Sequence, residues 1–243
     1  MTEEKRRNNG KPILSLWALL ARCSIYKILT VLAAMALAEV LLFYRCRRTG
    51  GGYTLEGAVM SSHLSVVFMA TLGLVCFVLA WTQGRLDARS SATMLRLQLS
   101  GSRIFMIKTV YNVVCIMMLF MAQIWLGIWL VRVYGREMEE IYALPQRLFL
   151  AFYRIDFLHC LLPMAEIGKW VRNLLLLLAL GTEAAGAKKK NYIPLFALLA
   201  LNVNSFVSSM GVNVIDLICC LTYIVVITAN IWQVRKAQRE EGM

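Results

Sequence analysis

Six long apolar segments constrain the fold of this chain more than any other feature. Each is long enough to cross the roughly 30 Å hydrocarbon core of a bilayer as a helix, which takes about 17–25 residues. Apolar and polar residues do not alternate in segments of about ten, so membrane-spanning strands are not indicated. We predict an all-α, polytopic membrane helical bundle with six transmembrane helices. These helices cover residues 28–44, 57–81, 109–131, 170–187, 192–210 and 214–234.

The composition agrees with a membrane protein and excludes an ordinary soluble enzyme. The chain is 59% hydrophobic and 16% charged, whereas soluble domains average about 25% charged residues. Its net charge of +12 does not indicate nucleic acid as a partner, because the basic residues lie between apolar segments. Cytoplasmic termini place about two thirds of the 26 Lys and Arg residues on the inside. We therefore predict a multi-pass protein of the cell (plasma) membrane with both termini cytoplasmic.

This topology predicts three parts of the chain and two helices at the membrane surface. Residues 1–27 form a cytoplasmic N-terminus, residues 28–234 a single transmembrane domain, and residues 235–243 a cytoplasmic tail. Residues 12–22 begin with a proline and have apolar residues at helical spacing, which predicts an amphipathic surface helix. Residues 148–162 predict an outer interfacial or re-entrant helix.

The predicted cytoplasmic loop at residues 82–108 contains a basic amphipathic helix. At about 100° per residue, four arginines fall within about 40° of one another on its surface. They are Arg85, Arg89, Arg96 and Arg103. We expect the Ser100-Gly101-Ser102 triplet to end this helix. A basic helix of this kind binds anionic membrane lipid or a cytosolic partner.

The order of these elements resembles that of the six-span permease subunits of bacterial ABC export systems. The resemblance covers residues 12–234 and includes the leading surface helix, two spans, the basic loop helix and four further spans. It implies a separate cytosolic ATP-binding subunit and a second permease, which is either another copy or a homologous chain. It assigns ATPase coupling to Arg85, Leu86, Asp87, Arg89, Met94, Leu95, Arg96 and Leu97.

The motifs of nucleotide-binding and hydrolytic enzymes are missing from the sequence. It contains no G-x-x-x-x-G-K-[ST], H-E-x-x-H or G-x-S-x-G motif and no C-x-x-C pair. We therefore assign no catalytic residue, no metal site and no cofactor to this chain, and expect ATP and Mg on the partner ATPase. The sequence is interpreted as a permease subunit, not an enzyme, that exports a lipophilic or amphipathic compound. The alternatives are a membrane scaffold and a transporter that is not driven by ATP.

Polar residues within the apolar segments are candidates for a substrate path. An ionisable side chain inside a membrane is costly and marks a functional hypothesis. Glu39 either pairs with an arginine at the end of its span or lines such a path. The other polar residues either form hydrogen bonds between helices, cap wet helix ends, or line the same path. The candidates are Glu39, His63, Gln123, Asn202, Asn204 and Asp216.

Overall fold

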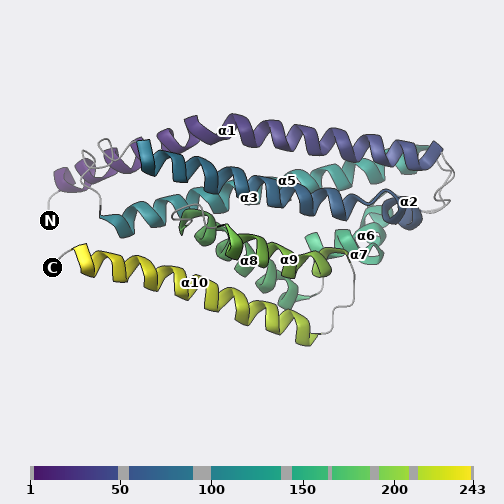
Figure 1. Cartoon of the computed structure of the whole chain (residues 1–243). Coiled ribbons are helices and arrows are strands. Elements are labelled where there is room, and N and C mark those ends of the chain that lie inside the picture. Colours follow the sequence, from purple (N-terminus) through teal and green to yellow (C-terminus); the bar gives the residue numbers. More distant parts are fainter. Residues whose placement is uncertain are drawn as a thin grey trace.

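The fold is a bundle of helices (Figure 1). The computed structural model describes residues 3–48, 55–89, 100–137, 144–163, 166–186, 192–207 and 213–241. The helices are α1 (Glu3–Arg48), α2 (Leu55–Ser61), α3 (Leu64–Arg89), α5 (Gly101–Glu137), α6 (Leu144–Arg154), α7 (Asp156–Leu161), α8 (Ile167–Gly186), α9 (Ile193–Val207) and α10 (Asn213–Glu241). The N and C ends lie at the same end of the bundle, which we call the terminal end, and α2, α6 and α7 lie at the opposite end (Figure 1).

Helix α8 lies at the centre of the packing. Its most extensive contacts are with α10 and α5, while α1 packs on α3 and α5, and α9 packs on α3 and α7. Four phenylalanines join α3, α5, α7 and α9 through ring contacts whose centroids are between 5.2 and 6.1 Å apart. They are Phe68, Phe120, Phe157 and Phe206. Such edge-to-face rings stabilise the core beyond the burial of their area.

In the part of the chain that the structure describes, four helices are long and apolar enough to cross a membrane. They are Ile13–Arg48, Leu64–Arg85, Gly101–Tyr134 and Val214–Glu240. Large apolar side chains on α10, such as Val225 and Trp232, are more than 60% exposed. Such side chains are unfavourable in contact with water and favourable in contact with lipid. These helices indicate a multi-pass membrane protein. The described residues are almost all helical and contain no strand, which confirms the all-α prediction.

The predicted fourth and fifth spans correspond to α8 and α9, which are less apolar or shorter than the other four. The apolar stretch of α9 within the described residues, Ile193–Val203, is shorter than a span. Every 18-residue stretch of α8 includes Lys169, Arg172 and Glu183. Because Lys169 and Arg172 are buried against neighbouring helices, α8 does not expose these charges to lipid. The count of six spans stays a prediction, since four of the described helices are both long enough and apolar enough to cross a membrane.

The predicted second span, residues 57–81, is divided in the structure. Helix α2 ends at Ser61, and α3 begins at Leu64. His63 between them has a φ of 52°, which a non-glycine residue rarely adopts. The hydroxyl of Ser62 donates a hydrogen bond of 3.0 Å to the carbonyl of Val59, and such side-chain bonds compete with helix continuation.

The expected surface helix at residues 12–22 is the first part of α1 instead of a separate element. With a rise of about 1.5 Å per residue, the 46 residues of α1 extend for about 69 Å. Leu16 and Leu20 are buried, and the rings of Trp17 and Tyr111 meet edge to face at 5.6 Å. This part of α1 therefore packs on α5. The predicted helix at 148–162 is divided into two helices, α6 and α7, with Ile155 between them, and its outer position stays a prediction.

Candidate functional site

Buried polar side chains that pair across helices form the candidate site. The hydrocarbon region offers no water, so a polar group there is stable only with a partner inside the protein. Among the described residues, such contacts between helices include the hydroxyl pair Ser24 and Tyr111 and four pairs that contain an amide or charged side chain. These four pairs are Glu39 with Gln123, Gln83 with Asn112, Arg172 with Asp216, and Asn202 with Tyr223.

Glu39 of α1 is paired with Gln123 of α5. The Nε2 atom of Gln123 donates a hydrogen bond of 2.8 Å to Oε2 of Glu39, and both side chains are at most 1% exposed. Gln123, and not an arginine at the end of α1, therefore provides the hydrogen bond to this carboxyl group. The Oε1 atoms of both residues are buried without a hydrogen-bond partner in the described part of the chain.

Gln83, Asn112 and Gly181 link α3, α5 and α8 through a chain of hydrogen bonds. Gln83 Nε2 donates to Asn112 Oδ1, and Asn112 Nδ2 donates to the carbonyl of Gly181 over 3.1 Å. A Cβ atom on Gly181 would lie 2.6 Å from Cγ2 of Val113. The absence of a side chain at Gly181 thus allows the close approach of α8 to α5 that this chain of hydrogen bonds requires.

Arg172 of α8 forms a buried ion pair with Asp216 of α10. The distance from Nη1 to Oδ1 is 2.7 Å, and the two side chains are 3% and 12% exposed. The Arg172 guanidinium also lies 5.8 Å from the ring centroid of Phe206. Asn173 accepts a hydrogen bond from Arg172 and donates one of 2.8 Å to the carbonyl of Cys160 in α7. The ion pair therefore joins α7, α8 and α10.

A second charged cluster lies at the start of α8. Glu166 Oε2 is 2.9 Å from Lys169 Nζ, and Glu166 Oε1 is 3.5 Å from His159 Nε2. The hydrogen bond from Lys169 lowers the pKa of the Glu166 carboxyl from its ordinary value of 4.5. Glu166 is 46% exposed, so solvent weakens these interactions.

The remaining candidates for a substrate path do not form one site. Asn202 is fully buried and accepts a hydrogen bond from the hydroxyl of Tyr223. His63 is exposed at the turn before α3. The side chain of Asn204 lies outside the described residues. The structure therefore brings Glu39 together with Gln123, whereas Asn202 and Asp216 pair with residues that were not candidates.

The residues expected to couple to an ATPase lie in the last turns of α3 and beyond its end. The Arg85 guanidinium lies 5.0 Å from the ring centroid of Trp81. Leu86, Asp87 and Arg89 belong to the last turns of α3, and their side chains lie outside the described residues. Met94, Leu95, Arg96 and Leu97 lie outside them entirely. Ser100 precedes α5, and its carbonyl accepts a hydrogen bond of 3.1 Å from the Ile104 amide; the expected end of the loop helix at this triplet stays a prediction.

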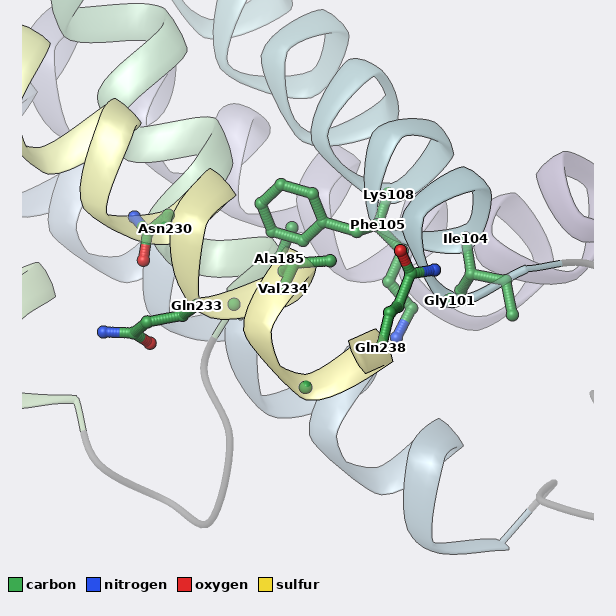
Figure 2. A pocket seen from close by; sticks show the side chains of 11 residues that line it. Gly101, Ile104, Phe105, Lys108, Ala185, Asn230, Gln233, Val234 and Gln238 are labelled. Carbon is green, nitrogen blue, oxygen red and sulfur yellow. The ribbon is translucent and has the colours of Figure 1, made fainter. Parts of the chain in front are cut away.

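A cavity of about 160 Å³ lies at the terminal end, between the start of α5, the end of α8 and α10. In Figure 2, Gln238 lies next to Gly101 on one side of the cavity, and Asn230 lies earlier in α10. With its amide oriented to satisfy both groups, the Gln238 oxygen accepts hydrogen bonds from the amides of Gly101 (3.2 Å) and Ser102 (2.7 Å). The C-terminal part of α10 thus caps the helix that follows the basic loop.

Four of the paired residues were not candidates from the sequence. They are Gln83, Asn112, Arg172 and Tyr223. Gln83 and Asn112 are polar residues close to the ends of apolar segments, where water is the simpler expectation. A charge in an apolar segment requires a partner, so Arg172 was a signal that a carboxylate such as Asp216 would lie opposite it.

No protein-family model, no curated protein and no solved structure matches this chain. The fold and the buried polar pairs define its class as a multi-pass helical membrane protein.

Proposed function

We propose that the chain is the permease subunit of an ABC-type transporter, docked through the connection between α3 and α5 on a separate cytosolic ATPase. The hydrogen-bonded chain Gln83–Asn112–Gly181 carries this proposal. Gln83 lies near the end of α3, and Asn112 lies in the first part of α5, so both helices that flank the basic connection are joined to α8. A displacement of this connection by an ATPase would therefore move α8 as well.

The other buried pairs support the same mechanism. Arg172 and Asp216 join α8 to α10, and Asn202 and Tyr223 join α9 to α10. Helices linked by buried polar contacts shift between discrete packings and do not deform continuously. Movement of α8 would thus reposition the helices around a transport path built with a second permease. The apolar character of the helices favours a lipophilic or amphipathic cargo.

Affinity purification in mild detergent followed by mass spectrometry tests the proposal. We expect the tagged chain to retain a stoichiometric ATPase with a phosphate-binding loop, and native mass measurement to give two permeases and two ATPases. Charge reversal at Arg89 and Arg96 should lower the retained ATPase at least tenfold while the permease stays in the membrane fraction. The matched control reverses Arg132 and Arg154, which are exposed basic residues away from the connection, and should retain the ATPase.

A transporter that is not driven by ATP is the second candidate, and Glu39 favours it. A fully buried carboxyl group with an acceptor that lacks a partner is the kind of group that ion-coupled transporters place inside a membrane. Purification of the intact chain without any ATPase would reject the first proposal. An ion gradient that drives uptake into vesicles through the wild type, and not through Glu39→Gln, would establish the second.

A further inference from the structure

An apolar groove of about 640 Å³ runs between α3 and α9. Its floor and walls include Ala70, Gly73 and Phe77 from α3 and Phe196, Leu199 and Val203 from α9. None of the described residues that line it has an ionisable or amide side chain. Phe196 and Val203 are about half exposed, so the groove opens on the outer surface of the bundle, which faces lipid in a membrane protein.

The length of the groove matches one leaflet of a bilayer. It extends along α3 from Val66 to Phe77, which corresponds to about 16 Å at 1.5 Å per residue. Half of a hydrocarbon core of roughly 30 Å is about 15 Å. A fatty acyl chain that lies along the bilayer normal would therefore fit the groove from end to end.

Aromatic side chains mark one end of the groove. The ring of Phe77 lies 5.2 Å from that of Trp81 and 5.4 Å from that of Tyr192, measured between centroids. Trp and Tyr are enriched at the level where hydrocarbon meets the lipid headgroups. These two residues thus place the headgroup region directly beyond Phe77, towards the terminal end of the bundle (Figure 1).

A positive charge lies at the same end. Arg85 follows Trp81 by one helical turn, is exposed, and has its guanidinium 5.0 Å from the centre of the Trp81 ring. This contact draws the charge back towards the groove. A guanidinium binds a phosphate oxygen pair through parallel hydrogen bonds, and anionic lipids are concentrated in the cytoplasmic leaflet, on which side we propose the terminal end to lie.

We propose that this groove is a binding site for an anionic phospholipid. One acyl chain lies between α3 and α9, Trp81 and Tyr192 flank the glycerol region, and Arg85 binds the phosphate and the negative headgroup. The site needs no ATPase, so its test is independent of the proposed transport function. It also assigns Arg85 to the membrane, and leaves contact with an ATPase to Arg89 and the residues after it.

Lipid retention by the purified full chain tests the site. The detergent-solubilised protein, stripped of lipid, is incubated with phosphatidylglycerol or phosphatidylcholine of the same acyl chains, and bound lipid is counted by native mass spectrometry. We expect the wild type to retain one lipid per chain, with about a fivefold preference for phosphatidylglycerol, the size expected for one arginine near a headgroup. No preference in the wild type would overturn the proposal.

Two variants separate the headgroup contact from the groove. Arg85→Gln should retain both lipids equally, whereas Arg132→Gln, at an exposed arginine elsewhere, should keep the preference. Gly73→Leu should lower retention of both lipids at least fivefold, because its Cβ fits 3.7 Å from Leu199 and the rest of the side chain enters the groove. Gly168→Leu is the matched control, since nothing lies within 4 Å of a Cβ there, and it should bind like the wild type.

A second groove-filling variant and three outcomes complete the test. Ala200→Leu fills the groove from the opposite helix and replaces Gly73→Leu if that variant is not monodisperse on gel filtration. An unchanged preference in Arg85→Gln, or unchanged retention in both filled variants, would overturn the proposal. A lipid-free dimer that dissociates on filling the groove would also overturn it, and would identify the occupant as a second copy of the chain.

Discussion

Gln123 donates a hydrogen bond of 2.8 Å from Nε2 to Oε2 of Glu39, and this bond joins α1 to α5 within the bundle. Both side chains are almost completely buried. Each also has an Oε1 atom that lacks a hydrogen-bond partner among the described residues. The pair is thus half satisfied, because each residue keeps one buried acceptor oxygen without a donor.

This geometry predicts opposite effects for two substitutions. Gln123→Leu leaves the Glu39 carboxyl without its donor and should lower the free energy of unfolding by about 1–3 kcal/mol. Glu39→Gln introduces an NH₂ group that can donate to Gln123 Oε1, so it should unfold at or above the wild-type temperature. Thermal unfolding in detergent measures both variants.

Thr30→Val is the control for the substitutions at Glu39 and Gln123. Thr30 is exposed on α1, and its hydroxyl bonds only the carbonyl of Tyr26 in the same helix. We expect a change within about 0.5 kcal/mol. If Glu39→Gln were as unstable as Gln123→Leu, the prediction would be wrong. The amide group at position 39 would then not supply the donor that Gln123 Oε1 lacks.

Arg172 and Asp216 should show strong energetic coupling. Removal of one partner leaves a buried charge uncompensated, so Arg172→Met and Asp216→Leu should each cost about 3–5 kcal/mol. The double substitution removes both charges and should be close to the wild type in stability. A double-mutant cycle from unfolding in detergent measures the coupling, and additive losses would show that the two side chains do not act as a pair.

The sequence predicted the class of the fold better than the boundaries of its helices. Apolar length identified α5 and α10, but α5 begins at Gly101, eight residues before the predicted span. Nothing in the sequence between residues 57 and 81 resembles a helix stop. The break comes from the side-chain hydrogen bond of Ser62 and the positive φ of His63, neither of which the apolar pattern indicates. Polarity also identified Glu39 and Gln123, and one member each of the pairs Arg172–Asp216 and Asn202–Tyr223. It could not identify which residues pair, since Glu39 and Gln123 meet across 84 positions through packing alone.

Glu166 should make the stability of the protein sensitive to acid. Its pKa is lowered in the folded protein by the hydrogen bond from Lys169, so its contribution is complete above the ordinary pKa of 4.5 and is lost as the pH falls through the lowered pKa. Solvent screening limits this contribution to about 0.2–1 kcal/mol, because the pair is partly exposed. Unfolding temperatures measured from pH 7 to pH 3 should therefore fall less steeply below 4.5 for Glu166→Gln than for the wild type.

Glu240→Gln serves as the comparison for Glu166→Gln. The Glu240 carboxylate is exposed and lies 4.0 Å from Lys236 at the end of α10. Its substitution should leave the acid dependence of the wild type unchanged. Parallel curves for Glu166→Gln and the wild type would show that the contact with Lys169 does not stabilise the folded state.

Gly181 should tolerate no side chain. A Cβ there would lie 2.6 Å from Val113 Cγ2 and 3.3 Å from the carbonyl oxygen of Thr109, so Gly181→Ala must push α8 away from α5. We expect a loss of about 1–3 kcal/mol from overpacking, whereas Gly84→Ala, with nothing within 4 Å of its Cβ, should gain about 0.4–1 kcal/mol. Adding Val113→Ala removes the closest atom and should restore part of the stability lost in Gly181→Ala. Thermal unfolding measures the stability of the three variants. Equal effects at Gly181 and Gly84 would contradict the prediction. They would mean that α5 and α8 do not approach closely enough for Asn112 to donate a hydrogen bond to the Gly181 carbonyl.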